Sequence, residues 1–165
     1  MIGSRVLMLG LMAGLSSACN ASWGESAVPM LTVSELEPRI HELDGARVRV
    51  AGYLGQCAGY DCQLYRSKAD FEIWERAVEA VRQSKKTALP DVPSLAIGAG
   101  KDFEFDAEAA PFAGSYVVIT GKVTDACRQD GRPVCTDRGP DLNPTDISTW
   151  RGESAPAAKR GASPS

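Results

Sequence analysis

LDGARVRVAGYL (residues 43–54) and FAGSYVVITGKV (residues 112–123) share one pattern of apolar and glycine positions. Apolar and polar residues alternate in the first stretch, and Val117, Ile119 and Val123 share one face of the second, which is typical of strands with a buried face. Gly52 and Gly121 occupy matching places inside them, and a glycine inside a strand suggests a bulge or a sharp bend. Two long strands that bend at a glycine favour a small sheet that curls on itself.

Two helices are expected around the first strand. Thr32 and Glu35 match a capping box, which predicts a short helix with an apolar face formed by Val33, Leu36 and Ile40. Ser67, with Asp70 three residues later, predicts the start of a second helix that ends near Lys85.

The second helix carries an apolar stripe with a clear helical period, namely Phe71, Trp74, Val78 and Val81. We expect this stripe to face the core, and the alternative is a surface that binds a partner. DFEFD (residues 102–106) alternates and predicts a further strand. Its three acids would face water, and a calcium site is the alternative.

The pattern LDG-x-x-V-x-V-x-G-x-L, preceded by a short helix and followed by YVVITGKV, resembles the small OB-fold-like domains of bacterial exported proteins and lipoproteins. The resemblance covers residues 31–150. It implies a mainly β fold of the α+β class with one or two helices, built as a five-stranded, partly open barrel. The usual OB helix lies between the third and fourth strands, whereas the main helix here follows the second. Many members of this group have no assigned activity.

The first eighteen residues predict a signal peptide. Arg5 precedes an apolar run, residues 6–15, that is too short to span a bilayer. LSSACNAS (residues 15–22) resembles a bacterial lipobox in which Cys19 would carry the lipid, although Ser16 stands where that family prefers leucine. Ordinary cleavage at a nearby small residue is the alternative.

The rest of the chain divides by composition. Residues 19–30 are small and polar and are predicted to be a tether, and residues 31–150 are predicted to be one barrel domain. Residues 151–165 lack large apolar side chains and are predicted to be a disordered tail.

The chain has five cysteines, and an odd number in an exported protein needs an explanation. Acylation of Cys19 would leave four that can pair in an oxidising compartment. The Asp130-Gly131 turn favours one disulfide across its hairpin, and a compact loop favours the other. The predicted pairs are Cys57–Cys62 and Cys127–Cys135, and the other connectivities stay open. The spacings do not fit the CxxC knuckles of a zinc site or the CxxC of a redox dithiol.

Composition and motifs disfavour several functions. The formal net charge is −3, so nucleic acid is not expected as a partner. His41 is the only histidine, and no nucleophile elbow or phosphate-binding loop is present in the sequence. We therefore predict no catalytic residues, no cofactor and no metal site.

The candidate ligand surface is the polar face of the first strand with two residues expected nearby: Arg47, Arg49 and Tyr53, with Tyr65 and Lys122. OB barrels bind oligonucleotides or oligosaccharides on such a surface through aromatic and basic side chains. The simpler interpretation is that these are ordinary solvated residues.

The sequence thus favours a non-enzymatic module, exported to the periplasm or anchored facing it, that binds or scaffolds an envelope protein or glycan. The alternatives are a dedicated oligonucleotide- or oligosaccharide-binding module and an unrecognised enzyme.

Overall fold

The computed structural model describes residues 28–151 except 59–60, 84–87, 130–131 and 136–138. The predicted signal peptide, the acylation site at Cys19 and nearly all of the predicted tail lie outside the described residues.

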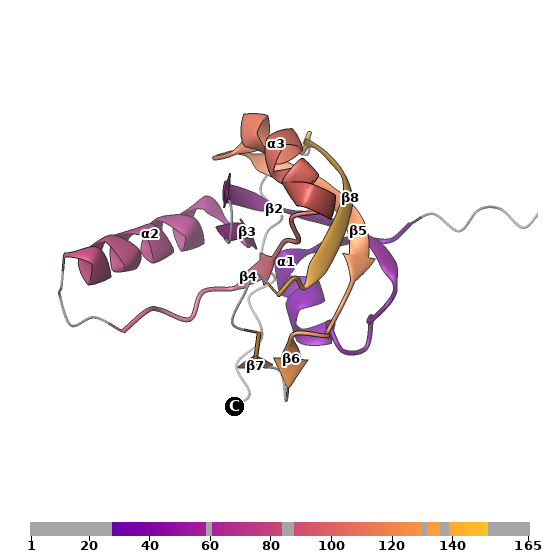
Figure 1. The fold of residues 1–165 in the computed structure, drawn as a ribbon, viewed down its shortest axis with the longest axis horizontal. Coiled ribbons are helices and arrows are strands. Elements are labelled where there is room, and N and C mark those ends of the chain that lie inside the picture. The colour runs from indigo at the N-terminus through magenta and orange to yellow at the C-terminus, as the bar shows by residue number, and fades with distance from the viewer. Residues whose placement is uncertain (1–27, 59–60, 84–87, 130–131, 136–138, 152–165) are drawn as a thin grey trace, which may run out of the picture.

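Most strands of the fold belong to one sheet (Figure 1), which has the order β4-β3-β2-β5-β8 with β1 paired to β2. β1 runs parallel to β2, and the other neighbours in this order are antiparallel. The strand bounds are β1 Met30–Thr32, β2 Arg47–Ala58, β3 Asp61–Tyr65, β4 Ser94–Ala96, β5 Tyr116–Val123 and β8 Leu142–Thr149. A separate hairpin is formed by β6 Arg128–Gln129 and β7 Arg132–Pro133.

The described chain has three short or medium α-helices, where the sequence predicted one or two. They are α1 Val33–Leu36, α2 Lys68–Arg82 and α3 Glu104–Ala109. A 3-10 turn extends α1, and two more flank α3. The predicted class, mainly β within α+β, is confirmed.

The two outer strands of this order meet at one place. Ile97, directly after β4, forms a parallel bridge with Leu142 at the start of β8. The Gly98 N–H donates to the Leu142 carbonyl at 2.9 Å, and the Asp141 N–H donates to the Ala96 carbonyl at 2.8 Å. The inner face of the sheet therefore curves around a core.

The core confirms the alternation predicted for the first strand. Val48 and Val50 are fully buried while Arg47 and Arg49 are exposed. The helices α1 and α3 cover the inner face of the sheet with their own apolar side chains. The core cluster contains Val33 and Leu36 of α1, Phe105 and Ala109 of α3, and Leu54, Leu64, Leu95, Val117, Ile119, Val123, Leu142 and Ile147 of the sheet and its borders.

The two mid-strand glycines serve different purposes. Gly121 lies at a shift of the β5–β8 register, where one extra residue of β8 is accommodated, so the predicted bend is found there. Gly52 stays in register with Val117. A Cβ at Gly52 would lie 2.7 Å from Leu64 Cγ, so glycine is needed there for close packing.

Both predicted helix starts are confirmed. The Thr32 N–H donates to Glu35 Oε2 at 2.8 Å, and the Glu35 N–H donates to Thr32 Oγ1 at 3.3 Å. Ser67 Oγ accepts from the Asp70 N–H at 3.2 Å. Burial alone would raise the pKa of Asp70, but hydrogen bonds from Arg66 and Ser67 lower it on balance.

The strand predicted at DFEFD is wrong. Lys101–Phe103 form a 3-10 turn and α3 follows, with Asp102 and Phe103 at positive φ. Phe105 is buried in the core, but Phe103 is 51% exposed. An alternation of five residues is too short to decide between strand and helix, and the alanine-rich residues that follow favour a helix.

The apolar stripe of α2 does not face the core, contrary to the prediction. α2 projects from the sheet (Figure 1), and Asp70 is its only buried residue. The reason is competition for the same surface: α1 and α3 already cover the inner face, so α2 meets only the outer face, at its first turn.

Candidate functional site

The three predicted basic residues lie on one exposed face of the sheet. Arg47 of β2 is the register partner of Lys122 of β5, and Arg49 pairs with Thr120. Paired residues project from the same side of a sheet, and residues two apart on one strand share that side. Asp146 of β8 is the register partner of Thr120, so this face also carries one carboxylate beside the three cations. Because like charges in direct cross-strand pairs repel, the end of the face at Arg47 and Lys122 gains most from an anionic partner.

A shallow hollow of about 460 Å³ lies beside these cations. Its lining combines two guanidinium groups with apolar and hydroxyl side chains: Met30, Arg49, Val118, Ser148, Thr149, Trp150 and Arg151. The backbone N–H of Trp150 donates to the Tyr116 carbonyl at 3.0 Å, which fixes the backbone of Trp150 directly after β8. Guanidinium groups bind carboxylates through paired hydrogen bonds, and an indole offers a flat apolar surface.

The two predicted tyrosines are not accessible to a ligand, contrary to the prediction: Tyr53 lies on the same side of β2 as Arg49, and Tyr65 is its register partner in β3, but both are covered by α2. Tyr53 and Tyr65 are 5% and 2% exposed. Their rings pack against Phe71 of α2, with centroid distances of 5.5 Å and 5.4 Å. Burial, followed by the charges of Asp61 and Glu75, raises the pKa of Tyr65. These tyrosines hold α2 on the sheet, so they offer no stacking platform to a ligand.

Of the residues that line the hollow, sequence reasoning predicted only Arg49 as a site residue. It missed Met30, Val118, Ser148, Thr149, Trp150 and Arg151. Met30 was assigned to the tether, yet it pairs with Arg49 in β1. Trp150 directly follows the last strand, and that position was its only signal.

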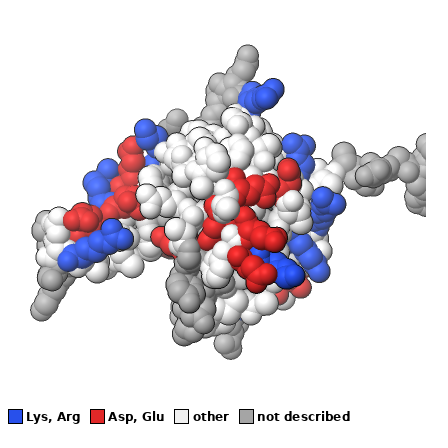
Figure 2. Space-filling view, turned by 45° about the horizontal axis from the view of Figure 1, so that its top comes forward, with Lys and Arg blue, Asp and Glu red and all other residues white. Residues whose placement is uncertain are grey.

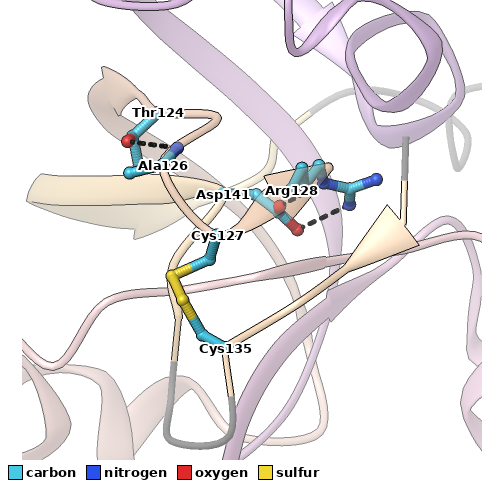
Figure 3. Close-up of a disulfide and its surroundings, with 6 residues drawn as sticks. All are labelled: Thr124, Ala126, Cys127, Arg128, Cys135 and Asp141. Atoms are coloured by element: carbon cyan, nitrogen blue, oxygen red, sulfur yellow. Dashed lines mark hydrogen bonds and ion pairs between the residues drawn. A yellow bond between two sulfur atoms is a disulfide. The ribbon is translucent and has the colours of Figure 1, made fainter. Parts of the chain in front are cut away.

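Both predicted disulfides are present. Cys57 and Cys62 are register partners in the β2–β3 hairpin, with Cα atoms 4.0 Å apart. Cys127 and Cys135 close the β6–β7 hairpin across 5.1 Å between Cα atoms (Figure 3). Disulfides of this kind are typical of a chain that folds in an oxidising compartment outside the cytoplasm.

The second hairpin is tied to the sheet by a largely buried ion pair (Figure 3). Arg128 donates to the two carboxylate oxygens of Asp141 at 2.6 Å and 2.9 Å. The Asp141 side chain is 8% exposed, and it also accepts from the Ala96 N–H at 2.9 Å. The Asp141 hydrogen bond raises the pKa of Arg128, whereas burial raises the pKa of nearby Glu37.

His41 lies on the surface rather than in a hollow. Its side chain is 98% exposed, and Nδ1 lies 2.6 Å from Asp125 Oδ2. The hydrogen bond to Asp125 raises the pKa of His41. Within the described ranges no group of three or more His, Cys, Asp or Glu side chains could hold a metal ion. The part of the chain that the structure describes also contains no helix long and apolar enough to cross a membrane.

Comparison with known proteins gives no relative for this chain. No family model matches it, and neither a curated protein nor a solved structure is significantly similar.

Proposed function

We propose that this chain is an exported, non-enzymatic binding module of the bacterial cell envelope, built on an OB-like barrel and anchored by acylated Cys19. Its ligand is an anionic oligosaccharide. The observation that carries the proposal is the hollow lined by Arg49 and Arg151 together with Trp150 and other apolar side chains.

The order of the elements supports an OB-like barrel. With β2, β3, β4, β5 and β8 counted as five strands, the contact of β4 with β8 at Ile97 and Leu142 brings the ends of the sheet together. The helix α3 then lies between the third and fourth strands, which is the place of the usual OB helix. In this reading α2 is an insertion after the second strand, which accounts for the apparent departure from the OB pattern.

The chemistry of the hollow favours a sugar acid. Sugar rings have apolar faces that pack on an indole, and their carboxylates would pair with the guanidinium groups. A single strand of nucleic acid would need a longer basic track with several aromatic platforms. Tyr53 and Tyr65 are buried, so they add none beside Arg47 and Arg49.

Titration with an oligogalacturonate of three to six residues tests this function. We expect saturable binding that weakens with salt, and Arg49→Gln should weaken it about tenfold to a hundredfold because a charge-assisted hydrogen bond contributes roughly 1.5–3 kcal/mol. Arg76→Gln is the matched control, because Arg76 is exposed on α2, outside the hollow.

Two reference ligands sharpen the titration. Maltohexaose of similar size carries no charge and should bind far more weakly, and a twelve-nucleotide thymidine strand should not compete. Equal affinity for the uronate and the neutral glucan, or binding unaffected by Arg49→Gln, would refute the proposed ligand class.

The anchor is tested separately by the intact mass of the protein from a bacterial host. We expect a chain that begins at Cys19 with the added mass of a lipidated cysteine and with no alkylatable thiol before reduction. A chain that begins at Asn20 or later would rule out the anchor and leave the binding proposal standing.

A further inference from the structure

Arg47 and Lys122 face each other where two like charges approach most closely in a sheet. They are register partners in β2 and β5. In the next pair along, the Val123 N–H donates to the Ala46 carbonyl at 2.9 Å. Hydrogen-bonded and non-hydrogen-bonded pairs alternate in an antiparallel ladder, so Arg47 and Lys122 form a non-hydrogen-bonded pair. The Cα atoms of such a pair are only about 4.5 Å apart, and its side chains are close.

No carboxylate neutralises this pair within the part of the chain that the structure describes. Both residues are exposed, and neither forms an ion pair with a described residue. The second register partner of Lys122, Asn143 of β8, is uncharged. Like charges directly opposite one another destabilise a sheet. An anion bound between Arg47 and Lys122 would therefore relieve a repulsion that the described chain does not relieve.

This basic pair is continuous with the hollow of the proposed function. Arg49, which lines the hollow, lies two residues from Arg47 on the same side of β2. Two residues of a strand span about 7 Å. Figure 2 shows several Lys and Arg side chains on the side of the molecule from which the N-terminal trace leaves, where β1 joins β2. Arg49, Arg47 and Lys122 thus form one basic strip along β2.

The neighbours of Arg49 give the strip a direction. Thr120 of β5 pairs with Arg49 on one side and with Asp146 of β8 on the other. Asp146 is exposed. An anionic chain that left the hollow toward β8 would meet this carboxylate, whereas a chain that follows β2 meets the two cations Arg47 and Lys122.

We propose that the strip holds two carboxylates of one oligouronate. The first carboxylate binds in the hollow at Arg49, and the second binds between Arg47 and Lys122, so the sugar chain runs along β2. This inference rests on the proposed function and adds to it the direction of the ligand and the least number of charges that the ligand carries. Once the first carboxylate has bound, the second is held near its subsite at a high effective concentration. A single sugar acid fills the hollow alone.

The alternative occupant of the pair is a separate small anion, because guanidinium groups bind phosphate as well as carboxylate. The carboxylate of the same ligand is favoured because the pair lies one step along β2 from Arg49, and because Asp146 opposes a path across the sheet. The two occupants differ in one measurable way. Only a carboxylate of the same chain makes the pair important for long ligands and unimportant for short ones.

Isothermal titration calorimetry of the full chain with Cys19→Ser, which cannot be acylated, tests the two subsites. The probes are methyl α-galacturonide, with one carboxylate, and trigalacturonate, with three. We expect trigalacturonate to bind at least about tenfold more tightly, because it adds a charge-assisted contact. Lys122→Gln should weaken trigalacturonate binding about tenfold and leave the monosaccharide unchanged.

Controls separate this effect from ligand length, net charge and folding. Trigalacturonate with all but one carboxylate methyl-esterified has the same length and should bind like the monosaccharide. Arg76→Gln removes a positive charge from α2, outside the strip, and should leave both affinities unchanged. Lys122→Gln should raise the unfolding midpoint of the free protein, because it removes the repulsion from Arg47. Unfolding would then not account for the lost affinity.

The outcomes distinguish the second subsite from the hollow. Equal affinities for the monosaccharide and trigalacturonate, or an equal loss for both in Lys122→Gln, would overturn the second subsite and leave the hollow standing. Inorganic phosphate that binds at the pair while trigalacturonate is bound would assign the pair to a separate anion and likewise overturn it. If neither sugar acid binds, the proposed function fails and this inference fails with it.

Discussion

Asp141→Ala is expected to lower the free energy of unfolding by about 3 kcal/mol, because removing one partner of a buried ion pair leaves the other charge buried and unpaired. The substitution also removes the acceptor for the Ala96 N–H. Both losses fall at the place where β4 meets the start of β8, so the second disulfide hairpin would come loose from the sheet. Urea unfolding followed by tryptophan fluorescence measures the change.

The control for this substitution is an ion pair on the surface. Arg39 and Glu42 are hydrogen-bonded at 2.9 Å and 3.0 Å, but their side chains are 43% and 64% exposed. Exposed pairs contribute little to stability, so Glu42→Ala should not change the unfolding midpoint measurably. Equal effects of the two substitutions would show that Asp141 does not join the hairpin to the sheet.

Gly121→Ala is expected to lower the free energy of unfolding by about 2–3 kcal/mol through overpacking. A Cβ at Gly121 would lie 2.5 Å from the Asn143 carbonyl oxygen and 3.0 Å from Leu142 Cγ. The first of these neighbours is backbone in a paired strand, so it cannot move aside without opening the β5–β8 register.

Gly45→Ala provides the comparison, since that glycine has φ of +78° and a Cβ there would meet nothing closer than Lys122 Cε at 3.7 Å, an ordinary contact. Its cost should come from backbone conformation alone, at about 1 kcal/mol. Chemical denaturation of both variants separates overlap from backbone strain. A smaller loss for Gly121→Ala than for Gly45→Ala would mean that the strands are less closely packed at the register shift.

The features that sequence predicted best depend on neighbouring residues. These features are each contained within a few residues: the alternation at Arg47–Val50, the caps at Thr32 and Ser67, and the hairpin closed by Cys127 and Cys135. The predicted Asp130-Gly131 turn itself lies outside the described residues. The hydrophobic period of a strand, a helix cap and a turn residue each act on residues only a few positions away. These local patterns were therefore enough to predict the local structure.

The direction in which α2 faces could not be predicted in this way. Periodicity shows that a helix has an apolar face, but not which surface covers it. Here Val33 of α1 and Phe105 of α3 occupy the inner face of the sheet, so the stripe of α2 finds no room there. Which helix covers that face depends on the whole fold.

The hollow was missed for a related reason. Met30 and Trp150 are separated in sequence by most of the domain. They line one surface only because β1 pairs with β2 and β8 pairs with β5, on either side of the β2–β5 pair. Arg49 was identified from its alternation in β2, but the neighbours that give it a function follow from strand order. Strand order is set by contacts that are distant in sequence.

The most direct test of the central claim is a residue-level map of oligogalacturonate binding by two-dimensional NMR on the nitrogen-15-labelled chain. The account predicts saturable shifts of the Arg49, Val118 and Trp150 signals, including the Trp150 indole N–H, with no change at Arg76. Shifts confined to other surfaces, or none at millimolar ligand, would contradict a ligand site on this face of the sheet.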